Sequence, residues 1–438
     1  MKTTLNEQNT AAILQKLGQA NAEFAAAYPG DSHDRQPVHT LYGGAHLFRS
    51  DSPVTLGIKA LESLRRYAPD GESLAGAMGI GAATAETVYA RVVAKLEREA
   101  VEDFRIDFED GFGFRPNPEE DAEAERTAIE LARAAERHTL PPFIGIRTKP
   151  LTELLRARSL RTLDIFVSTL LERTGRWLPD GFVVTLPKVQ MPEQVAALVE
   201  VFEILESAHK LPAGALRMEI MIETPQAIIN SRGESGIPAL IDAARGRCRG
   251  AHFGSYDYTS LCNITASHQT LLHPACDYAR QAMLVSLAQR GVFLSDGVTN
   301  ILPISREGDA AVIHRAWRLH VEHVRNGLIN GFYQGWDLHP AQLPARYAAV
   351  YSFFLEGLDA ATARLKNFID RAAQATLVRE VFDDAATGQG LLNFFLRGLG
   401  CGALTDAEVF KTGLNLDELR TRSFPRILEA RMGGVAWR

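Results

Sequence analysis

Residues 217–224 read Arg-Met-Glu-Ile-Met-Ile-Glu-Thr, an apolar run that ends abruptly at the carboxylate of Glu223. Pro225 follows two residues later and opens a helical pattern, which is typical of a buried strand that leads into a helix. A carboxylate at the tip of a buried strand is costly to desolvate unless a cation neutralises it. Residues 250–257, Gly-Ala-His-Phe-Gly-Ser-Tyr-Asp, have the same form and end at Asp257. We therefore predict that Glu223 and Asp257 are strand-tip ligands of one divalent cation.

The rest of the chain repeats this pattern of a short strand followed by a helix. Six further β-prone runs lie at 38–45, 104–110, 142–147, 181–188, 292–298 and 330–339. Strands that alternate with helices form parallel units, and eight such units predict a (β/α)₈ barrel, the TIM-barrel fold. A doubly wound open sheet is the alternative, but no Gly-x-Gly-x-x-Gly motif follows the first strand.

Three regions follow from this pattern. Residues 1–36 predict an N-terminal helix and a linker rich in helix breakers, and residues 37–343 predict the barrel. Residues 344–438 are helical throughout and predict a C-terminal extension. The apolar run 391–396 in this extension needs a surface to cover it, so we expect a homo-oligomer. The extension would then cover either its own barrel or the site of a neighbouring subunit.

Composition excludes several classes of protein. The 438 residues carry a net charge of −6 without a basic patch, so we expect no nucleic-acid partner. No apolar run reaches about 18 residues, which predicts no membrane span. The N-terminus is polar and does not resemble a signal peptide. The four cysteines have neither zinc-site nor disulfide-scaffold spacing, which favours reduced thiols in a cytoplasmic protein.

Polar residues gather where the predicted strands end, and in such barrels the active site lies at the carboxyl ends of the strands. Besides Glu223 and Asp257, these residues are Glu109, Asp110, Arg147, Lys188, Asp296 and His339. Two carboxylates completed by water and substrate oxygens suit Mg²⁺ or Mn²⁺. A nearby arginine would stabilise an enolate oxygen as negative charge develops on it. Lys188 alternatively suggests the Schiff-base lysine of a metal-free aldolase, but the carboxylate pair argues against that route.

Seven motifs in order carry a resemblance to a known superfamily. They are Phe104-Arg-Ile-Asp-Phe-Glu-Asp110, Gly145-Ile-Arg147, Met221-Ile-Glu-Thr224, Phe253-Gly-Ser-Tyr-Asp257, Asp277-Tyr-Ala-Arg280, Ser295-Asp-Gly-Val298 and Leu338-His-Pro-Ala-Gln342. With this spacing the chain resembles the HpcH/HpaI aldolase and citrate lyase β-subunit superfamily, which is related to malyl-CoA lyases and malate synthases. Thr148 and Lys149 stand where that superfamily has asparagine after the arginine, which indicates a divergent branch.

The resemblance implies roles for individual residues. Glu223 and Asp257 would bind Mg²⁺, and Arg147 would hold the substrate oxygens and stabilise the enolate. Glu109, with Asp110 behind it, would orient Arg147 or a metal-bound water. Further candidates are Asp296 and His339 for substrate binding and Asp383 for acid–base catalysis. His339 would also close the floor of the site together with Gln342. In the acyl-CoA branch that last aspartate comes from a C-terminal segment, often of a neighbouring subunit.

Each of these residues also has a purely structural interpretation. Arg147 could form a structural ion pair, and Asp296 precedes a glycine and could form a turn. His339 could be a core histidine, and Asp383 could cap a helix.

The resemblance implies a Mg²⁺-dependent carbon–carbon lyase that acts on a 3-hydroxy acid or its CoA thioester through an enolate, giving a 2-oxo acid or an aldehyde. A malate-synthase-like condensation or an acyl-CoA thioester hydrolysis on the same scaffold is the second hypothesis. A non-catalytic barrel that binds a dicarboxylate is the third.

Overall fold

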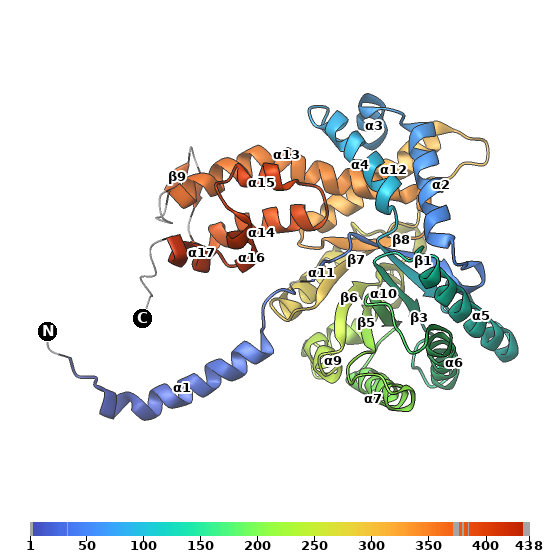
Figure 1. Ribbon diagram of the computed structural model, residues 1–438, viewed down its shortest axis with the longest axis horizontal. Coiled ribbons are helices and arrows are strands. Elements are labelled where there is room, and N and C mark those ends of the chain that lie inside the picture. The colour runs from blue at the N-terminus through green and yellow to red at the C-terminus, as the bar shows by residue number, and fades with distance from the viewer. Residues whose placement is uncertain (1–2, 33, 371–375, 379–380, 384, 432–438) are drawn as a thin grey trace.

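Eight parallel strands form a closed barrel in the computed structural model, which describes residues 3–32, 34–370, 376–378, 381–383 and 385–431 (Figure 1). The strands are β1 (His39–Gly44), β2 (Asp103–Asp107), β3 (Phe143–Arg147), β4 (Phe182–Leu186), β5 (Arg217–Ile222), β6 (Cys248–Phe253), β7 (Phe293–Val298) and β8 (Gln334–Asp337). Strand β8 pairs with β1 and closes the sheet. The predicted (β/α)₈ barrel is confirmed, with each strand shorter than its predicted run.

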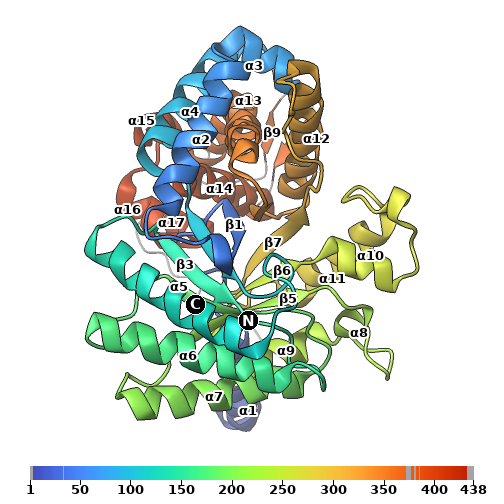
Figure 2. The same cartoon turned by 90° about the vertical axis from the view of Figure 1, so that its right-hand side faces the viewer.

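Helices surround the barrel in chain order, as Figure 2 shows from the side opposite the helical extension. Between β1 and β2 the chain forms three of them, α2 (Ser52–Tyr67), α3 (Gly71–Met78) and α4 (Ala85–Glu99). The later connections contain α5 (Asn117–Glu136), α6 (Arg156–Thr174), α7 (Pro192–His209), α8 (Pro225–Ile228), α9 (Ile237–Ala243), α10 (Ser255–Leu261), α11 (Pro274–Leu287) and α12 (Ala310–Ile329).

Helix α7 illustrates how the sequence sets these elements. Pro192 occupies the first turn, where its missing N–H has no partner to lose. Val195, Val199 and Phe202 recur at helical spacing and are fully buried in the hydrophobic core. Lys210 ends the helix in the left-handed conformation, at φ 57°. Helices of this kind gain most of their stability from the buried face rather than from intrinsic propensity.

The interior of the barrel is charged as well as apolar. Arg105 on β2 donates to Asp103 at 2.7 Å and to Glu219 on β5 at 2.8 Å. His252 on β6 lies 2.9 Å from the same Glu219 carboxylate. All four side chains are buried, and such groups are tolerated in a core only when they are paired. This ionic layer lies below the strand ends and separates the two ends of the barrel.

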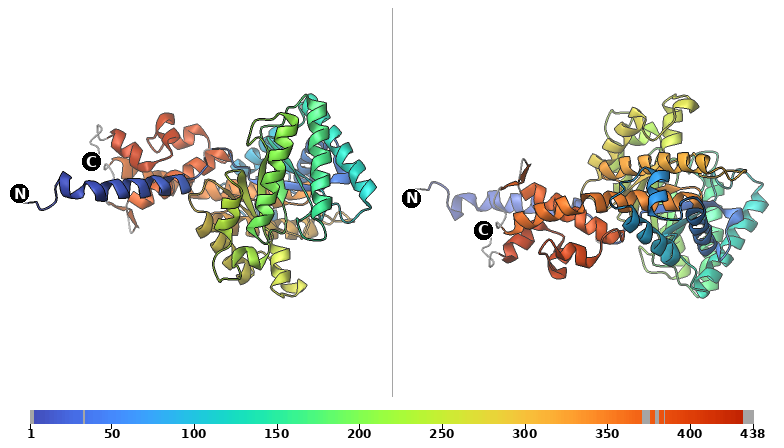
Figure 3. Two further views of the ribbon diagram at one scale, coloured as in Figure 1. Left: turned by 90° about the horizontal axis from the view of Figure 1, so that it is seen from below. Right: turned by 90° about the horizontal axis from the view of Figure 1, so that it is seen from above.

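The barrel and the extension share one helix, α13 (Leu343–Asp370). Its first turns pack on the barrel as the eighth barrel helix, where the Tyr347 hydroxyl donates to the Ala100 carbonyl at 3.0 Å. Its second half runs beyond the barrel and carries α14 (Ala385–Gly400), α15 (Asp406–Phe410), α16 (Leu416–Thr421) and α17 (Phe424–Arg431), as both views in Figure 3 show. The boundary predicted between residues 343 and 344 therefore falls at the start of a barrel helix.

The extension lies at the amino ends of the strands. Arg397 on α14 donates to the Gln36 side chain at 2.7 Å, and Gln36 precedes β1. In the apolar run 391–396, Leu392 and Phe395 are fully buried, and the ring of Phe394 packs at a tilt against that of Phe354 of α13, with centroids 5.2 Å apart. The chain thus covers this run itself, so the run no longer requires a second subunit, and the homo-oligomer stays a prediction.

Helix α1 (Glu7–Ala27) projects from the same end of the molecule as the extension (Figures 1 and 3). Several of its large apolar side chains, among them Ile13, Leu14 and Phe24, are exposed. None of the described helices combines the length and the hydropathy that a membrane crossing requires. All four cysteines are free thiols.

Candidate active site

A cavity of about 430 Å³ opens at the carboxyl ends of the strands. Several predicted site residues line it together with three aromatic rings; the lining includes Tyr42, Asp107, Asp110, Arg147, Glu223, Tyr256, Asp257 and Trp336. We call this cavity the mouth of the barrel. Its volume lies within the range of small-molecule sites.

Glu223 follows β5 directly and is 1% exposed. Its Oε1 accepts a hydrogen bond from the backbone N–H of Lys188 at 2.5 Å. Burial raises the pKa of Glu223 to about 8; the charge of Lys188 opposes this shift, and the neighbouring Asp257 adds to it. The positive charges around Glu223 therefore do not fully offset the cost of burying its ionised carboxylate.

Asp257 corrects one detail of the prediction. It lies in the first turn of helix α10, after β6 has ended at Phe253, and is not a strand tip. Gly254 makes the intervening turn, and a Cβ at that position would lie 2.2 Å from Glu223 Oε2. Only glycine therefore allows the two carboxylates to approach each other. The side chain of Asp257 is 36% exposed and faces the mouth.

Lys188 lies between the acidic side chains. Its backbone is left-handed, at φ 49°, a conformation that costs roughly 1 kcal/mol or more outside glycine. The ammonium Nζ lies 2.5 Å from Glu109, 3.0 Å from Asp257 and 3.3 Å from Asp110. Burial lowers the pKa of Lys188, but the charges of Glu223 and Glu109 outweigh it, so the net shift is well upward. A protonated amine is not a nucleophile, which argues further against a Schiff-base role.

The arrangement fits a divalent cation held by two carboxylates. Lys188 binds one oxygen of each, Glu223 Oε1 through its N–H and Asp257 Oδ2 through its ammonium. Within the described residues the other oxygen of each carboxylate has no hydrogen-bond partner, which leaves one ligand atom per side chain. Mg²⁺ is typically bound by one or two carboxylates and keeps several waters. The described residues include no group of three or more His, Cys, Asp or Glu arranged to hold a metal, so water or substrate would supply the other ligands.

Arg147 ends β3 and is rigidly held. Its Nε and Nη2 donate to the two oxygens of Asp107 at 2.7 and 2.5 Å, and its Nη1 lies 3.0 Å from Glu109. The ring of Tyr42 lies 4.9 Å from the guanidinium carbon. Burial lowers the pKa of Arg147, but Asp107 and Glu109 act against burial and the net shift is well upward, so the side chain stays charged. The predicted pairing of Glu109 with Arg147 is present.

Asp107 is the site residue that sequence reasoning missed. Its carboxylate accepts from Arg147 and also from the N–H groups of Glu109 and Gly111, at 2.9 and 2.7 Å. It therefore fixes both the arginine and the loop that follows β2. The signal was present in the alternation of Asp103, Arg105 and Asp107, because every second residue of a strand faces the same side.

Asp296 does not reach the mouth. It is buried on β7, accepts from the Gly297 N–H at 2.8 Å and lies 3.3 Å from Arg280 of α11. It lines a small space between β7 and the outer helices that also contains His320 and His323. The prediction of substrate binding by Asp296 is therefore corrected to an ion pair between the sheet and the helix layer.

His339 also has a structural position. Its Nδ1 accepts from the Ala341 N–H at 3.2 Å and caps the 3₁₀ helix η3 (Pro340–Gln342). The residue is partly buried and is not among those that line the mouth, although its neighbour Leu338 is. The Gln342 side chain accepts from the Leu338 N–H at 2.8 Å and donates to the Thr299 carbonyl at 2.8 Å. Gln342 thus ties the loop after β8 to the end of β7, whereas substrate binding by His339 is not supported.

Asp383 lies far from the mouth of its own barrel. It ends β10 (Val381–Asp383), which pairs with β9 (Thr376–Val378) in a two-stranded sheet. Figure 1 shows β9 at the end of the extension that is remote from the barrel. The side chain of Asp383 lies outside the part of the chain that the structure describes. A role for Asp383 in the site of its own chain is therefore excluded by its position, and only the predicted contribution to a neighbouring subunit is left.

Several solved structures resemble this fold. A citrate lyase from Burkholderia xenovorans LB400 has a TM-score of 0.55 at 18% identity, covering 75% of this chain and 93% of that one. The Haloferax volcanii malate synthase in its magnesium/glyoxylate complex has a TM-score of 0.47 at 16% identity, with coverages of 92% and 99%. The same enzyme in its pyruvate/acetyl-CoA complex has a TM-score of 0.44 at 17% identity, with coverages of 80% and 94%. At these identities the citrate lyase supports the shared barrel fold alone.

Comparison with curated proteins gave no sequence match. One family model matches residues 17–427, and its description is a domain of unknown function, DUF6986. That match spans the barrel and nearly all of the helical extension, so the two parts occur together in the family. The chain belongs to the DUF6986 family.

Proposed function

We propose that this protein is a Mg²⁺-dependent carbon–carbon lyase of the citrate-lyase-like type, acting on a 3-hydroxy acid or its CoA thioester. The observation that carries the proposal is the arrangement around Lys188. Lys188 binds one carboxylate oxygen of Glu223 and one of Asp257. Both carboxylates line a cavity of substrate size, together with the charged Arg147. A divalent cation bound by the two remaining oxygens would act as a Lewis acid toward the substrate oxygens.

Arg147 would bind and polarise the substrate. Asp107 holds two of its nitrogens, so the guanidinium cannot turn away when charge develops near it. Such a preorganised cation stabilises the oxyanion of an enolate without reorganising during the reaction. Tyr42 and Trp336, whose rings stack at 5.0 Å, would exclude water from one wall of the mouth.

In the proposed cleavage the bond between C2 and C3 of the 3-hydroxy acid breaks. The hydroxyl proton leaves, the C3–O bond becomes a carbonyl, and the electron pair of the broken bond passes to the enolate, which then takes up a proton. The carbonyl product is a 2-oxo acid or an aldehyde. The predicted acid–base residue Asp383 could take part only from a neighbouring subunit, which makes the homo-oligomer part of the proposal.

The test is deuterium exchange and condensation followed by NMR. Glyoxylate, pyruvate and oxaloacetate would be incubated in D₂O with and without acyl-CoAs, in Mg²⁺ or in EDTA. We expect Mg²⁺-dependent exchange at the carbon next to the carbonyl or thioester, lost in Glu223→Gln and in Arg147→Lys. Exchange that persists in EDTA, or that is unchanged in both variants, would sink the proposal.

The same experiment separates the alternatives. Free CoA without a new carbon–carbon bond indicates thioester hydrolysis, and a stable condensation product indicates malate-synthase-like chemistry. Calorimetric binding of an oxo acid without exchange or turnover indicates a non-catalytic barrel.

A further inference from the structure

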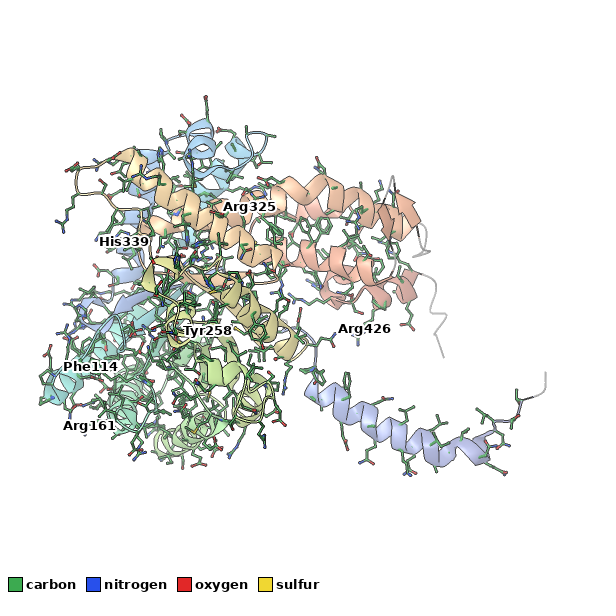
Figure 4. All side chains as sticks on the ribbon, turned by 180° about the vertical axis from the view of Figure 1, so that it is seen from behind. Phe114, Arg161, Tyr258, Arg325, His339 and Arg426 are labelled. Carbon is green, nitrogen blue, oxygen red and sulfur yellow. The ribbon has the colours of Figure 1, made fainter. Side chains whose placement is uncertain are left out.

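A second cavity lies at the opposite end of the barrel, with a volume of about 610 Å³. Three parts of the chain form it: linker residues 29–32 and 34–38, the amino ends of the barrel with α13, and the helices of the extension. Gln289 and Tyr333 in its wall precede β7 and β8, which places the cavity at the amino ends of the strands. We call it the arginine cavity, after Arg35, Arg397, Arg422 and Arg426, which line it. Figure 4 labels Arg426 there and His339 toward the other end of the barrel.

Two of these arginines are already paired. Arg35 lies 2.6 Å from Glu99 and 3.0 Å from Glu102, and Lys95 binds the same two carboxylates, so these two cations and two anions balance. Arg397 donates to Gln36, lies over the ring of Tyr333 at 4.9 Å and is 3.5 Å from Asp31. These contacts fix the guanidinium groups in the wall of the cavity and leave little uncompensated positive charge on them.

The other two arginines lack such partners. Arg422 donates only to the Ser32 carbonyl, at 3.1 Å, and forms no ion pair within the described residues. Burial lowers the pKa of Arg422, and the like charge of Arg397 lowers it further, while the charges of Asp31 and Asp34 offset only part of this shift. Arg426 is exposed, and its guanidinium has no hydrogen bond or ion pair with any described residue. Asp34 is the acid of the cavity lining left to face this pair, so one positive charge remains in excess.

The backbone of Arg422 is held in a strained conformation. Its φ of 51° is left-handed, and it caps the carboxyl end of α16. Gln389 of α14 donates to its carbonyl at 3.2 Å and accepts from the Phe424 N–H at 2.8 Å. Arg422 therefore points toward the linker from a backbone fixed on both sides, and such strain is often found at ligand-binding positions.

The cavity also has an apolar wall. It consists of Val38, Leu328, Val350, Phe354 and Leu396. Arginine binds carboxylate and phosphate through paired N–H groups, and an incoming anion would relieve the repulsion between Arg397 and Arg422. The volume exceeds what a bare inorganic ion fills and suits a small organic molecule.

We infer that the arginine cavity is a second binding site, for an organic anion whose carboxylate or phosphate binds Arg422 and Arg426 and whose apolar part lies on the wall of Leu328, Val350 and Phe354. The site does not depend on the proposed lyase activity, because it shares no residue with the mouth.

The test is isothermal titration calorimetry on the full chain in EDTA, where no metal can recruit anions to the mouth. Phenyl phosphate and benzoate present the two head groups on one apolar ring, inorganic phosphate presents a head group alone, and phenol presents the ring without a charge. We expect one site per chain for phenyl phosphate, benzoate or both, weaker binding of inorganic phosphate, and none of phenol. The preferred head group identifies the ligand class.

Variants assign the binding to the cavity. Arg422→Gln and Arg426→Gln should each weaken binding about tenfold, the value of a charge-assisted hydrogen bond. Arg420→Gln is the matched control, since Arg420 lies in α16, the helix that Arg422 caps, pairs with Asp417 and does not line the cavity. Arg426 is exposed, so its variant should fold even if Arg422→Gln does not, and circular dichroism would verify both. No saturable binding below about 10 mM, equal affinity in the two cavity variants and wild type, or equal affinity for phenol would each overturn the inference.

Discussion

The two ends of this barrel carry opposite charge. At the carboxyl ends of the strands Glu109, Asp110 and Asp257 surround the single ammonium of Lys188, with Glu223 bound to its backbone. At the amino ends four arginines line one cavity, and the charge of Arg422 and Arg426 exceeds that of the acids left to face them. An excess of buried carboxylate favours a cation, and an excess of arginine favours an anion. The same scaffold therefore offers two sites of different ligand chemistry, separated by the ionic layer of Arg105 and Glu219.

The largest expected effect concerns the metal at the mouth. Glu223→Gln and Asp257→Asn each replace a charged ligand by a neutral amide, so Mn²⁺ affinity measured by electron paramagnetic resonance should fall more than about 100-fold, beyond the usual effect of outer-sphere partners. Arg422→Gln, at the other end, should bind Mn²⁺ like wild type. Unchanged Mn²⁺ affinity in the two carboxylate variants would show that the cation does not bind at the carboxyl ends of the strands.

The next effect concerns the positioning of those carboxylates. Lys188→Met removes the ammonium that binds Asp257, so Mn²⁺ affinity should fall by about 10- to 100-fold, as for other outer-sphere partners. Lys210→Met is the control, because Lys210 is also left-handed but caps α7 away from the mouth. Tighter Mn²⁺ binding in Lys188→Met would mean instead that the ammonium competes with the cation.

A smaller effect is expected at the turn that brings the carboxylates together. The Cβ of Gly254→Ala would meet Glu223 Oε2 and Cβ at 2.2 and 2.3 Å, so the carboxylate must move. We expect a loss of about 1–3 kcal/mol in the free energy of unfolding and about tenfold weaker Mn²⁺ binding. Gly250→Ala, on the β6 strand that precedes this turn, has its closest contact at 3.4 Å and should be close to neutral. A fully functional Gly254→Ala would show that this close approach is not required.

The smallest effect concerns stability at the amino ends of the strands. His39 at the start of β1 is fully buried, burial lowers its pKa to about 4, and its Nε2 accepts from the Glu102 N–H at 3.3 Å. In the unfolded chain His39 is protonated below its ordinary pKa of 6.5, whereas in the folded chain it stays neutral down to about pH 4. Between pH 6.5 and 4 the unfolded chain therefore binds more protons than the folded chain. The free energy of unfolding should therefore decrease as the pH is lowered from 6.5 to 4, by at most about 3 kcal/mol from this group.

Urea unfolding in EDTA at a series of pH values measures this slope. His39→Gln should be less stable than wild type at neutral pH and should show a flatter dependence between pH 6.5 and 4. An identical slope in both proteins would show that His39 does not titrate as the buried geometry requires.

Strand positions and the main site residues were predictable because they depend on local pattern. The alternation of apolar runs and helices located all eight strands, and the motif order predicted together Glu223, Asp257 and Arg147, which line one cavity, and Glu109, which pairs with Arg147. The errors arose where side-chain direction matters. Asp296 faces the helix layer and pairs with Arg280, because alternate residues of a strand face opposite sides. His339 turns back to cap its own backbone.

By itself, the sequence determined the barrel, the order of its elements and the carboxylates that meet at its mouth, because hydrophobic periodicity and strand ends are properties of short segments. Only the tertiary structure decided that Lys188 binds one oxygen of each predicted metal ligand. Lys188 lies in the loop after β4 with a left-handed backbone, and it contacts Glu223 after β5 and Asp257 in α10. The tertiary structure also decided that the extension lies at the amino ends of the strands, away from the mouth and with Arg422 against the linker. Contacts between segments hundreds of residues apart leave no local pattern, because each partner alone is only a charged side chain at a helix end or in a loop.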